Sequence, residues 1–286
     1  MSTSSPFSRH LVKMLRRPGV LLGVVILLVS TVLAVFPQYL SPSDPNFIDY
    51  KAIRLPPSLS HPFGTDTLGR DCLSRVIWAY SINMQMAILA TVFALVIGVI
   101  VGALVGYYRG IADLIFGRVV DAIITFPFLV LVIAIVAVLG PGLINMYIAI
   151  TLVGWVYYAR LMRAEIIAQM GNDYAAAGRV MGYSDRRIIF RHLLPNVSSV
   201  VLVYLTLTIP RVMLFEAFLS FLGLGVEAPD VSWGLLAKEG IEVLSPVQVY
   251  WWLVLFPSLA LGATLLALNF LGDGIRDALD PRMKDR

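Results

Sequence analysis

Cysteine and histidine are scarce in this chain, and with them the groups that build most metal sites. The single cysteine, Cys72, excludes an internal disulfide and a cysteine-based metal cluster. The three histidines, His10, His61 and His192, are far apart in the sequence, and none lies in an apolar run. The chain also lacks Gly-x-x-x-x-Gly-Lys-Ser/Thr, His-Glu-x-x-His and Gly-x-Ser-x-Gly. It therefore has no nucleotide-binding P-loop of its own.

Charge is equally sparse. Charged residues make up 14% of the 286 residues, against about a quarter in soluble domains, whereas 58% of the residues are hydrophobic. This composition is typical of a polytopic membrane protein, whose surroundings are the lipid bilayer. The formal net charge of +4 is modest, so the placement of the charges is more informative than their sum.

The apolar runs predict an all-α fold with six transmembrane helices. Residues 1–18 form a basic tail, and 19–81 hold the first helix followed by a long loop rich in proline and serine. The first apolar run is longer than the apolar core of a usual signal peptide, which favours an uncleaved helix. Residues 82–271 form a core with five further helices, and 272–286 form a second tail.

Glycine and proline divide the core into its helices. The predicted helices cover 82–108, two segments within 122–159, then 197–215 and 248–271. Gly140-Pro141-Gly142 predicts a hairpin between the third and fourth helices. Pro127 predicts a kink in the third helix, and Pro210 with Arg211 an interruption near the end of the fifth.

Three glycines recur at a spacing of four in the second helix. Gly98, Gly102 and Gly106 fall on one helix face, where they allow the backbone of a neighbouring helix to approach closely. We interpret them as packing residues.

The basic residues predict which side of the membrane each segment faces. Most of the 22 lysine and arginine residues lie in the two tails and in the links 109–118 and 160–195. The remaining loops hold five: Lys51, Arg54, Arg70, Arg75 and Lys238. By the positive-inside rule, both termini are cytoplasmic and residues 41–80 face out.

One polar stretch, residues 171–195, lies between predicted membrane spans, and its pattern predicts a helix, a turn and a second helix. Asn172 or Asp173 can cap the first helix, and Gly182 is placed to end it with positive φ. Ser184 can cap the second helix, which is predicted to stop before Pro195.

The first helix of this hairpin has a nearly flat face, formed by Tyr174, Ala177, Gly178 and Met181. A flat face with a basic flank suits docking into a cleft on another protein. A DNA-binding helix-turn-helix is the first alternative, which the apolar spans on both sides argue against. An ordinary cytoplasmic loop is the second.

The hairpin resembles the "EAA" coupling loop of importer-type ABC transporter permeases. Gly182 and the pair Leu194-Pro195 match the motif, but Ala176 stands where the motif has its glutamate. Any salt bridge that this glutamate makes in relatives therefore cannot form here, because Ala176 carries no carboxylate. The resemblance implies that docking to an ATPase involves Asp173, Tyr174, Ala176, Ala177, Gly178, Gly182, Arg186, Arg187, Leu194 and Pro195.

A second resemblance lies in the segment His61–Arg75, whose glycines and charges predict a tight hydrogen-bonded turn that leads into a helix. This segment, with 229–234 and 272–281, is similar to the C subunit of the peptide/nickel branch of ABC permeases. The resemblance implies a type I importer fold in a bacterial cytoplasmic membrane. It also implies a second homologous permease, two ABC ATPases that bind ATP and Mg, and an extracytoplasmic substrate-binding protein.

Within this family, the expected function is import of di- or oligopeptides, and nickel or another small solute is the alternative. We expect no catalytic residue, metal ligand or cofactor in this chain, and no nucleic-acid partner. Arg211 and Glu216 are possible pathway or gate residues because ionisable groups at membrane depth are usually functional. A role as helix-end anchors is the structural alternative. An integral-membrane enzyme would need clustered titratable or metal-binding groups, whereas Asp121, Arg211 and Glu216 are dispersed. A secondary carrier is often built from inverted repeats, which we do not find in this sequence.

Overall fold

The computed structural model describes residues 17–279, which fold into helices joined by loops, with one isolated β-bridge between Thr65 and Asp71. The elements are α2 (Pro18–Val35), α3 (Pro37–Leu40), α4 (Cys72–Tyr108), α5 (Gly110–Thr125), α6 (Phe128–Leu139), α7 (Leu143–Met170), α8 (Asp173–Val180), α9 (Asp185–Arg187), the π-helix η1 (Ile188–Leu193), α10 (Leu194–Phe221), α11 (Trp233–Glu242) and α12 (Trp252–Leu279). The all-α class predicted from the sequence is confirmed for this part of the chain.

Within residues 17–279, four helical segments are long and apolar enough to cross a membrane: α2, α4, the continuous stretch Asp185–Phe221, and α12. The pair α5 and α6 is a fifth candidate if it counts as one span. α7 has 28 residues, but its polar residues, such as Asn145 and Arg160, keep it outside this group. Length and composition therefore support four to five spans, against the six expected.

The second predicted helix starts too late. α4 begins at Cys72 rather than at residue 82. Arg75 lies inside the helix and is only 2% exposed, because the carboxylates of Asp66 and Glu239 neutralise its charge. A charged residue is usually a sign that an apolar span has ended, and here it is not.

At the C-terminal boundary, α12 continues to Leu279, so residues 272–279 of the predicted tail are helical. The predicted tail residues 1–16 and 280–286 lie outside the described residues.

The prolines act differently from their predicted roles. At Pro127 the chain does not merely kink: α5 ends at Thr125, α6 starts at Phe128, and the two axes differ by 89°. Pro210, by contrast, lies inside the unbroken helix α10. Proline inside a membrane helix is tolerated because neighbouring groups can satisfy the freed carbonyl. The predicted break at Gly140–Gly142 is confirmed, since it separates α6 from α7.

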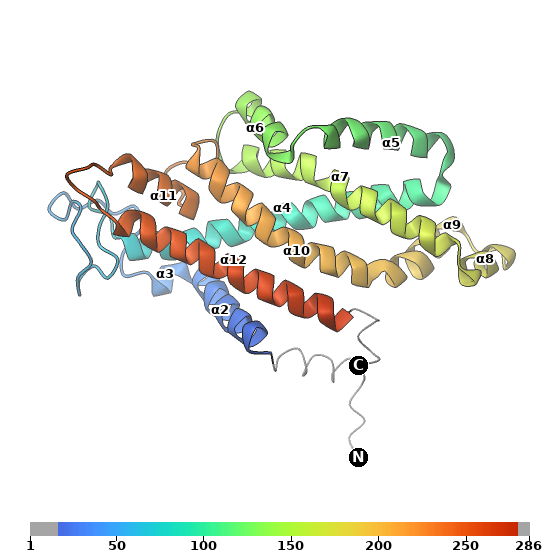
Figure 1. Ribbon diagram of the computed structural model, residues 1–286, viewed down its shortest axis with the longest axis horizontal. Helices are drawn as coiled ribbons and strands as arrows, with labels where there is room; N and C mark the ends of the chain where they lie inside the picture. The colour runs from blue at the N-terminus through green and yellow to red at the C-terminus, as the bar shows by residue number, and fades with distance from the viewer. Residues whose placement is uncertain (1–16, 280–286) are drawn as a thin grey trace, which may run out of the picture.

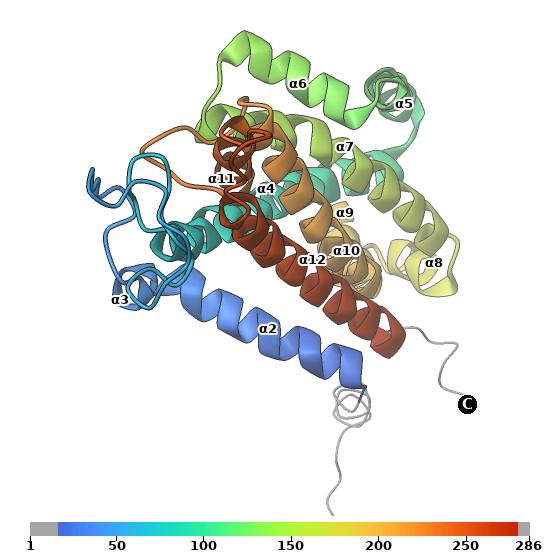
Figure 2. The same cartoon turned by 60° about the vertical axis from the view of Figure 1, so that its left-hand side comes forward.

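α4 is the central helix of the molecule, with α2, α7 and α10 packed around it (Figure 2). Its three glycines lie against α7: a Cβ atom at Gly98 would lie 2.6 Å from the carbonyl oxygen of Trp155, and one at Gly106 2.9 Å from that of Arg163. A side chain at either glycine would force the helices apart. The packing role proposed for the glycines agrees with this contact.

The elongated bundle has two distinct ends (Figure 1). α8 and α9 lie at one end, whereas α11 and the long loop that follows α3 lie at the other. α2 and α12 run side by side, and Arg17 forms an ion pair with Asp277. The two ends of the described chain therefore lie close together.

Candidate functional site

The hairpin of residues 171–195 contains a helix end that depends on glycine. Gly182 has a φ of +72°, the left-handed region in which L-residues with a side chain are strained. Its N–H donates to the carbonyl of Arg179, and the N–H of Tyr183 donates to the carbonyl of Gly178, both over 3.0 Å. This pair of bonds is the Schellman arrangement, which satisfies the last carbonyls of α8. The predicted positive φ at Gly182 is confirmed.

The predicted side-chain caps are wrong. Asn172 is the N-cap residue of α8, but its side chain donates to the side-chain oxygen of Gln169 over 3.0 Å instead of accepting a backbone N–H. Ser184 precedes α9 and makes no side-chain cap either. The position of the hairpin is therefore set by packing rather than by its caps.

Contacts with α4 and α7 hold the hairpin in place. The hydroxyl of Tyr107, at the end of α4, donates to the carboxylate of Asp185 over 2.6 Å. The guanidinium of Arg179 lies 5.5 Å from the centre of the Tyr107 ring, within cation–π range. Beneath these contacts is an apolar cluster of Ala103, Tyr107, Met162, Ile166, Ala175, Ile188, Ile189, Leu193 and Val197. The hairpin is consequently packed against three long helices, α4, α7 and α10.

Most of the predicted docking residues form the free surface of this hairpin. The exposed ones are Asp173, Tyr174, Ala176, Ala177, Gly182, Arg186, Arg187 and Pro195, and Leu194 is half-buried. Gly178 is the exception, because it is buried and a Cβ there would lie 3.5 Å from the ring of Tyr183 and 3.7 Å from Ile188. The predicted flat docking face therefore needs correction: Gly178 packs α8 on its own hairpin.

The second helix of the hairpin does not stop before Pro195, contrary to the prediction. α9 leads into η1 and then into α10, and Pro195 occupies the first turn of α10. Proline is tolerated in a first helical turn because its missing N–H needs no partner there. The hairpin and the long helix α10 are thus one continuous helical stretch from Asp185 to Phe221.

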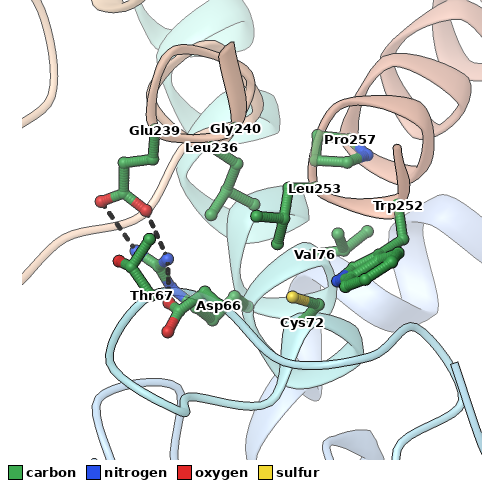
Figure 3. A pocket seen from close by; sticks show the side chains of 11 residues that line it. Asp66, Thr67, Cys72, Val76, Leu236, Glu239, Gly240, Trp252, Leu253 and Pro257 are labelled. Carbon is green, nitrogen blue, oxygen red and sulfur yellow. Dashed lines mark hydrogen bonds and ion pairs between the residues drawn. The ribbon is translucent and has the colours of Figure 1, made fainter. Parts of the chain in front are cut away.

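At the opposite end of the bundle, four charged side chains form a cluster: Asp66, Arg70 and Arg75 are buried, and Glu239 is half-buried. Arg75 donates to Asp66 over 2.7 Å and to Glu239 over 2.5 Å. Arg70 donates to Asp66 over 2.6 Å. Two guanidinium groups thus balance two carboxylates and join the loop before α4 to α11, which carries Glu239 (Figure 3).

The loop that supplies Asp66 is the tight turn predicted for His61–Arg75. Asp71 caps α4, since its carboxylate accepts from the N–H of Ser74 over 2.8 Å. Gly69 has a φ of +76°, and a Cβ there would overlap the carbonyl of Asp49. Next to the turn, Cys72 packs with Trp252 and Leu253 around a cavity of only about 20 Å³ (Figure 3). The predicted hydrogen-bonded turn that leads into a helix is confirmed, and its contacts are structural.

Glu216 belongs to a second buried polar group. It is 0% exposed, accepts from Ser220 over 2.8 Å, and also accepts from the side-chain amide of Asn83. Asn83 in turn accepts from the backbone N–H of Trp233 over 3.1 Å. This chain of bonds connects α10, α4 and α11. Sequence reasoning missed Asn83, although Asn83 and Gln85 are amides at the start of an otherwise apolar, uncharged run, which was a usable signal.

Arg211 and Glu216 lie in different surroundings. Arg211 is exposed and lines a cavity of about 270 Å³ between α4, α6, α7 and α10. Glu216 does not line that cavity. The two groups that the sequence analysis considered together therefore do not form one site.

No cluster suited to a metal ion occurs in residues 17–279, where no three His, Cys, Asp or Glu side chains come together. Cys72 starts α4 and His192 lies in η1. They belong to opposite ends of the bundle and cannot share a ligand.

Comparison with protein families gives two matches. The family described as "Binding-protein-dependent transport system inner membrane component" matches residues 94–285. The "N-terminal TM domain of oligopeptide transport permease C" matches residues 5–57.

Curated relatives extend over most of the chain. The dipeptide transport system permease protein DppC of Bacillus subtilis is 38% identical over 262 residues, which are 92% of this chain and 81% of that protein. The oligopeptide transport system permease protein OppC of the same organism is 37% identical, over 92% of this chain and 86% of its own length. The glutathione transport system permease protein GsiD of Escherichia coli is 40% identical, over 91% and 84%.

Proposed function

Because this chain belongs to the family of binding-protein-dependent transport system inner membrane components, we propose that it is the peptide-conducting permease subunit of an ATP-driven importer. The family is a transport family of ABC importer permeases, and it is not a family of enzymes. The observation that carries the peptide assignment is the shared chemistry of the relatives' names: dipeptide, oligopeptide and glutathione transport.

The proposed assembly contains this permease, a second homologous permease, two ABC ATPases and an extracytoplasmic binding protein. ATP and Mg bind to the ATPases, and this chain holds no cofactor of its own. The exposed hairpin 171–195 docks on an ATPase. When the ATPases close, the hairpin moves as a rigid lever, because Tyr107 and the apolar cluster beneath it tie it to α4, α7 and α10. The result is alternating access by rigid-body motion.

We also propose six membrane spans in a bacterial cytoplasmic membrane: α2, α4, the bent pair α5–α6, α7, α10 and α12. Both chain ends and the hairpin then face the cytoplasm, and the loop before α4 faces out. The ion pair between Arg17 and Asp277 supports this topology, since it places the two ends of the described chain together.

Reporter fusions test the topology. Alkaline phosphatase inserted at the exposed Leu59 is expected to be active, because the enzyme matures outside the cytoplasm, whereas a fusion after Arg286 is expected to be inactive. A fluorescent protein at the same two positions should give the opposite pattern. Phosphatase activity at Arg286 would overturn the topology.

A peptide is favoured over bare nickel as the cargo. Nickel prefers nitrogen and thiolate ligands, and the part of the chain described here holds no cluster of such residues. Peptide transport needs no such cluster, because a peptide offers charged ends and amide groups to ordinary polar side chains.

Uptake in cells with and without this gene decides between the cargoes. We expect deletion to abolish uptake of labelled di- to oligopeptides, whereas uptake of radioactive nickel at equal external concentration should be unchanged. Complementation with the wild-type gene controls for effects on neighbouring genes. Loss of nickel uptake with normal peptide uptake would contradict the peptide assignment.

A further inference from the structure

The 270 Å³ cavity between α4, α6, α7 and α10 is lined by apolar and aromatic side chains and by one charged one. Its described lining consists of Ala90, Thr91, Ala94, Phe128, Ile150, Gly154, Tyr157, Tyr158, Tyr204, Thr208, Arg211, Val212 and Phe215. Among these residues Arg211 alone carries a charge, and no carboxylate in residues 17–279 forms an ion pair with it. An exposed guanidinium that lines a mostly apolar cavity is free to pair with an anion that enters it.

Two hydroxyl groups that line the same cavity also lack well-formed hydrogen bonds. Thr91 is 1% exposed and its hydroxyl makes no hydrogen bond within the described chain; Tyr158 is 5% exposed, and its hydroxyl faces the Thr208 side chain without a bond of good geometry. Thr208 and Thr264, by contrast, donate to the carbonyl four residues earlier, which is the usual arrangement for threonine in a helix. Buried hydroxyls without partners are uncommon because the loss of water is not compensated. These two can both donate to a bound oxygen.

The aromatic residues shape the cavity on one side. Phe128, at the start of α6, stacks on Phe215 with ring centres 4.8 Å apart, and lies 6.1 Å from the ring of Tyr157. Thr208, Arg211 and Phe215 follow one another along one face of α10. The charge is thus bordered by apolar surface, which weakens screening by water and strengthens attraction to an anion.

From this geometry we propose that the cavity is a subsite for the carboxylate end of the transported cargo. The guanidinium of Arg211 pairs with the carboxylate, and the hydroxyls of Thr91 and Tyr158 donate to its oxygens or to the neighbouring amide. Arginine suits this role because its planar fork binds a carboxylate through two hydrogen bonds. The volume lies just below the roughly 300 Å³ at which small-molecule pockets begin, so the cavity takes one end of a peptide. This inference rests on the proposed peptide transport for the identity of the cargo.

Thiol labelling inside the cavity measures its preference for anions directly. Thr208→Cys places a thiol on the face of α10 that carries Arg211, and the native Cys72 is replaced by serine. The complete transporter in lipid nanodiscs is treated with an anionic and a cationic methanethiosulfonate of similar size, and labelling of this chain is followed by mass spectrometry. We expect Arg211→Gln to lower the ratio of anionic to cationic labelling rates about tenfold or more. Arg211→Lys should keep most of the preference.

Arg118→Gln is the matched control, because Arg118 is an exposed arginine on α5 that does not line the cavity. It should leave the ratio unchanged. An equal ratio in the wild type and in Arg211→Gln would overturn the proposal.

Protection from labelling identifies the ligand. Without binding protein, millimolar dialanine should slow labelling at least several-fold more than dialanine amide, and Arg211→Gln should abolish this difference. Tyr158→Phe, which removes only a hydroxyl, should reduce it partly. Equal protection by acid and amide would contradict the proposal. Protection by added anionic lipid but not by dialanine would assign the site to a lipid headgroup and would also contradict it.

These measurements are independent of the uptake experiment. If cells lacking the gene still import peptides while dialanine protects the purified transporter from thiol labelling, the peptide function fails and the carboxylate subsite stands. If uptake depends on the gene but acid and amide protect equally, the subsite fails and the transport function stands.

Discussion

Replacement of Gly182 by tryptophan is expected to leave the chain inserted in the membrane and to uncouple ATP hydrolysis from transport. Two effects act at this position. The φ of +72° costs a residue with a Cβ roughly 1–2 kcal/mol. Moreover, a Cβ at Gly182 meets no atom of residues 17–279 within 4 Å, so an indole there extends from the exposed hairpin into the space proposed for the ATPase. We expect transport to fall by about tenfold or more, which corresponds to about 1.4 kcal/mol of lost docking energy.

Two further variants separate backbone strain from bulk. Gly182→Asn keeps a residue that tolerates left-handed backbone, and it should retain most of the transport rate. Gly171→Ala is the matched control, because Gly171 has an ordinary helical φ of −76° and should accept a side chain without strain. The measurements are ATP hydrolysis and peptide uptake by the purified transporter in proteoliposomes. Normal coupled transport by Gly182→Trp would remove the docking role from this hairpin.

The sequence predicted the turn at Gly182 correctly because its determinants are local: a Schellman end needs only the chain around Gly182. The side-chain caps and the helix end before Pro195 were predicted wrongly. Gly178 was misassigned because its neighbours Tyr183, in the turn, and Ile188, in η1, fold back over it. Helical periodicity defines which residues share a face, but it does not define which face is covered by the rest of the protein.

The long-range features could not be predicted for the same reason. The charge of Arg75 predicts a loop residue, because its partner Glu239 is far away in the sequence. Pro127 and Pro210 have the same chemistry, but one marks an 89° bend and the other lies inside the unbroken helix α10. The cavity at Arg211 needs four helices, and Thr91 and Tyr158 carry no signal in the sequence that would connect them with Arg211.

Replacement of Arg75 by methionine is expected to be the most destabilising single change at the end opposite the hairpin. The side chain is 2% exposed and binds both Asp66 and Glu239. Methionine has a similar length but no charge, so two carboxylates would remain with Arg70 as their only cationic partner. Removing one partner from a buried ion pair typically costs about 3–5 kcal/mol. We expect a lower melting temperature of the purified transporter and faster proteolysis of the loop before α4.

The second carboxylate provides a test of the cause. If the loss comes from unbalanced buried charge, the double variant Arg75→Met with Glu239→Gln should recover part of the stability, because one guanidinium then faces one carboxylate. Lys238→Met is the matched control on the same helix: its pair with Glu242 spans 3.8 Å and is solvent-exposed, and such pairs contribute at most about 1 kcal/mol. An Arg75→Met protein as stable as the Lys238→Met protein would show that the charged cluster does not hold α11 to the loop before α4. A double variant less stable than Arg75→Met would show that the hydrogen bonds of Glu239 matter more than its charge.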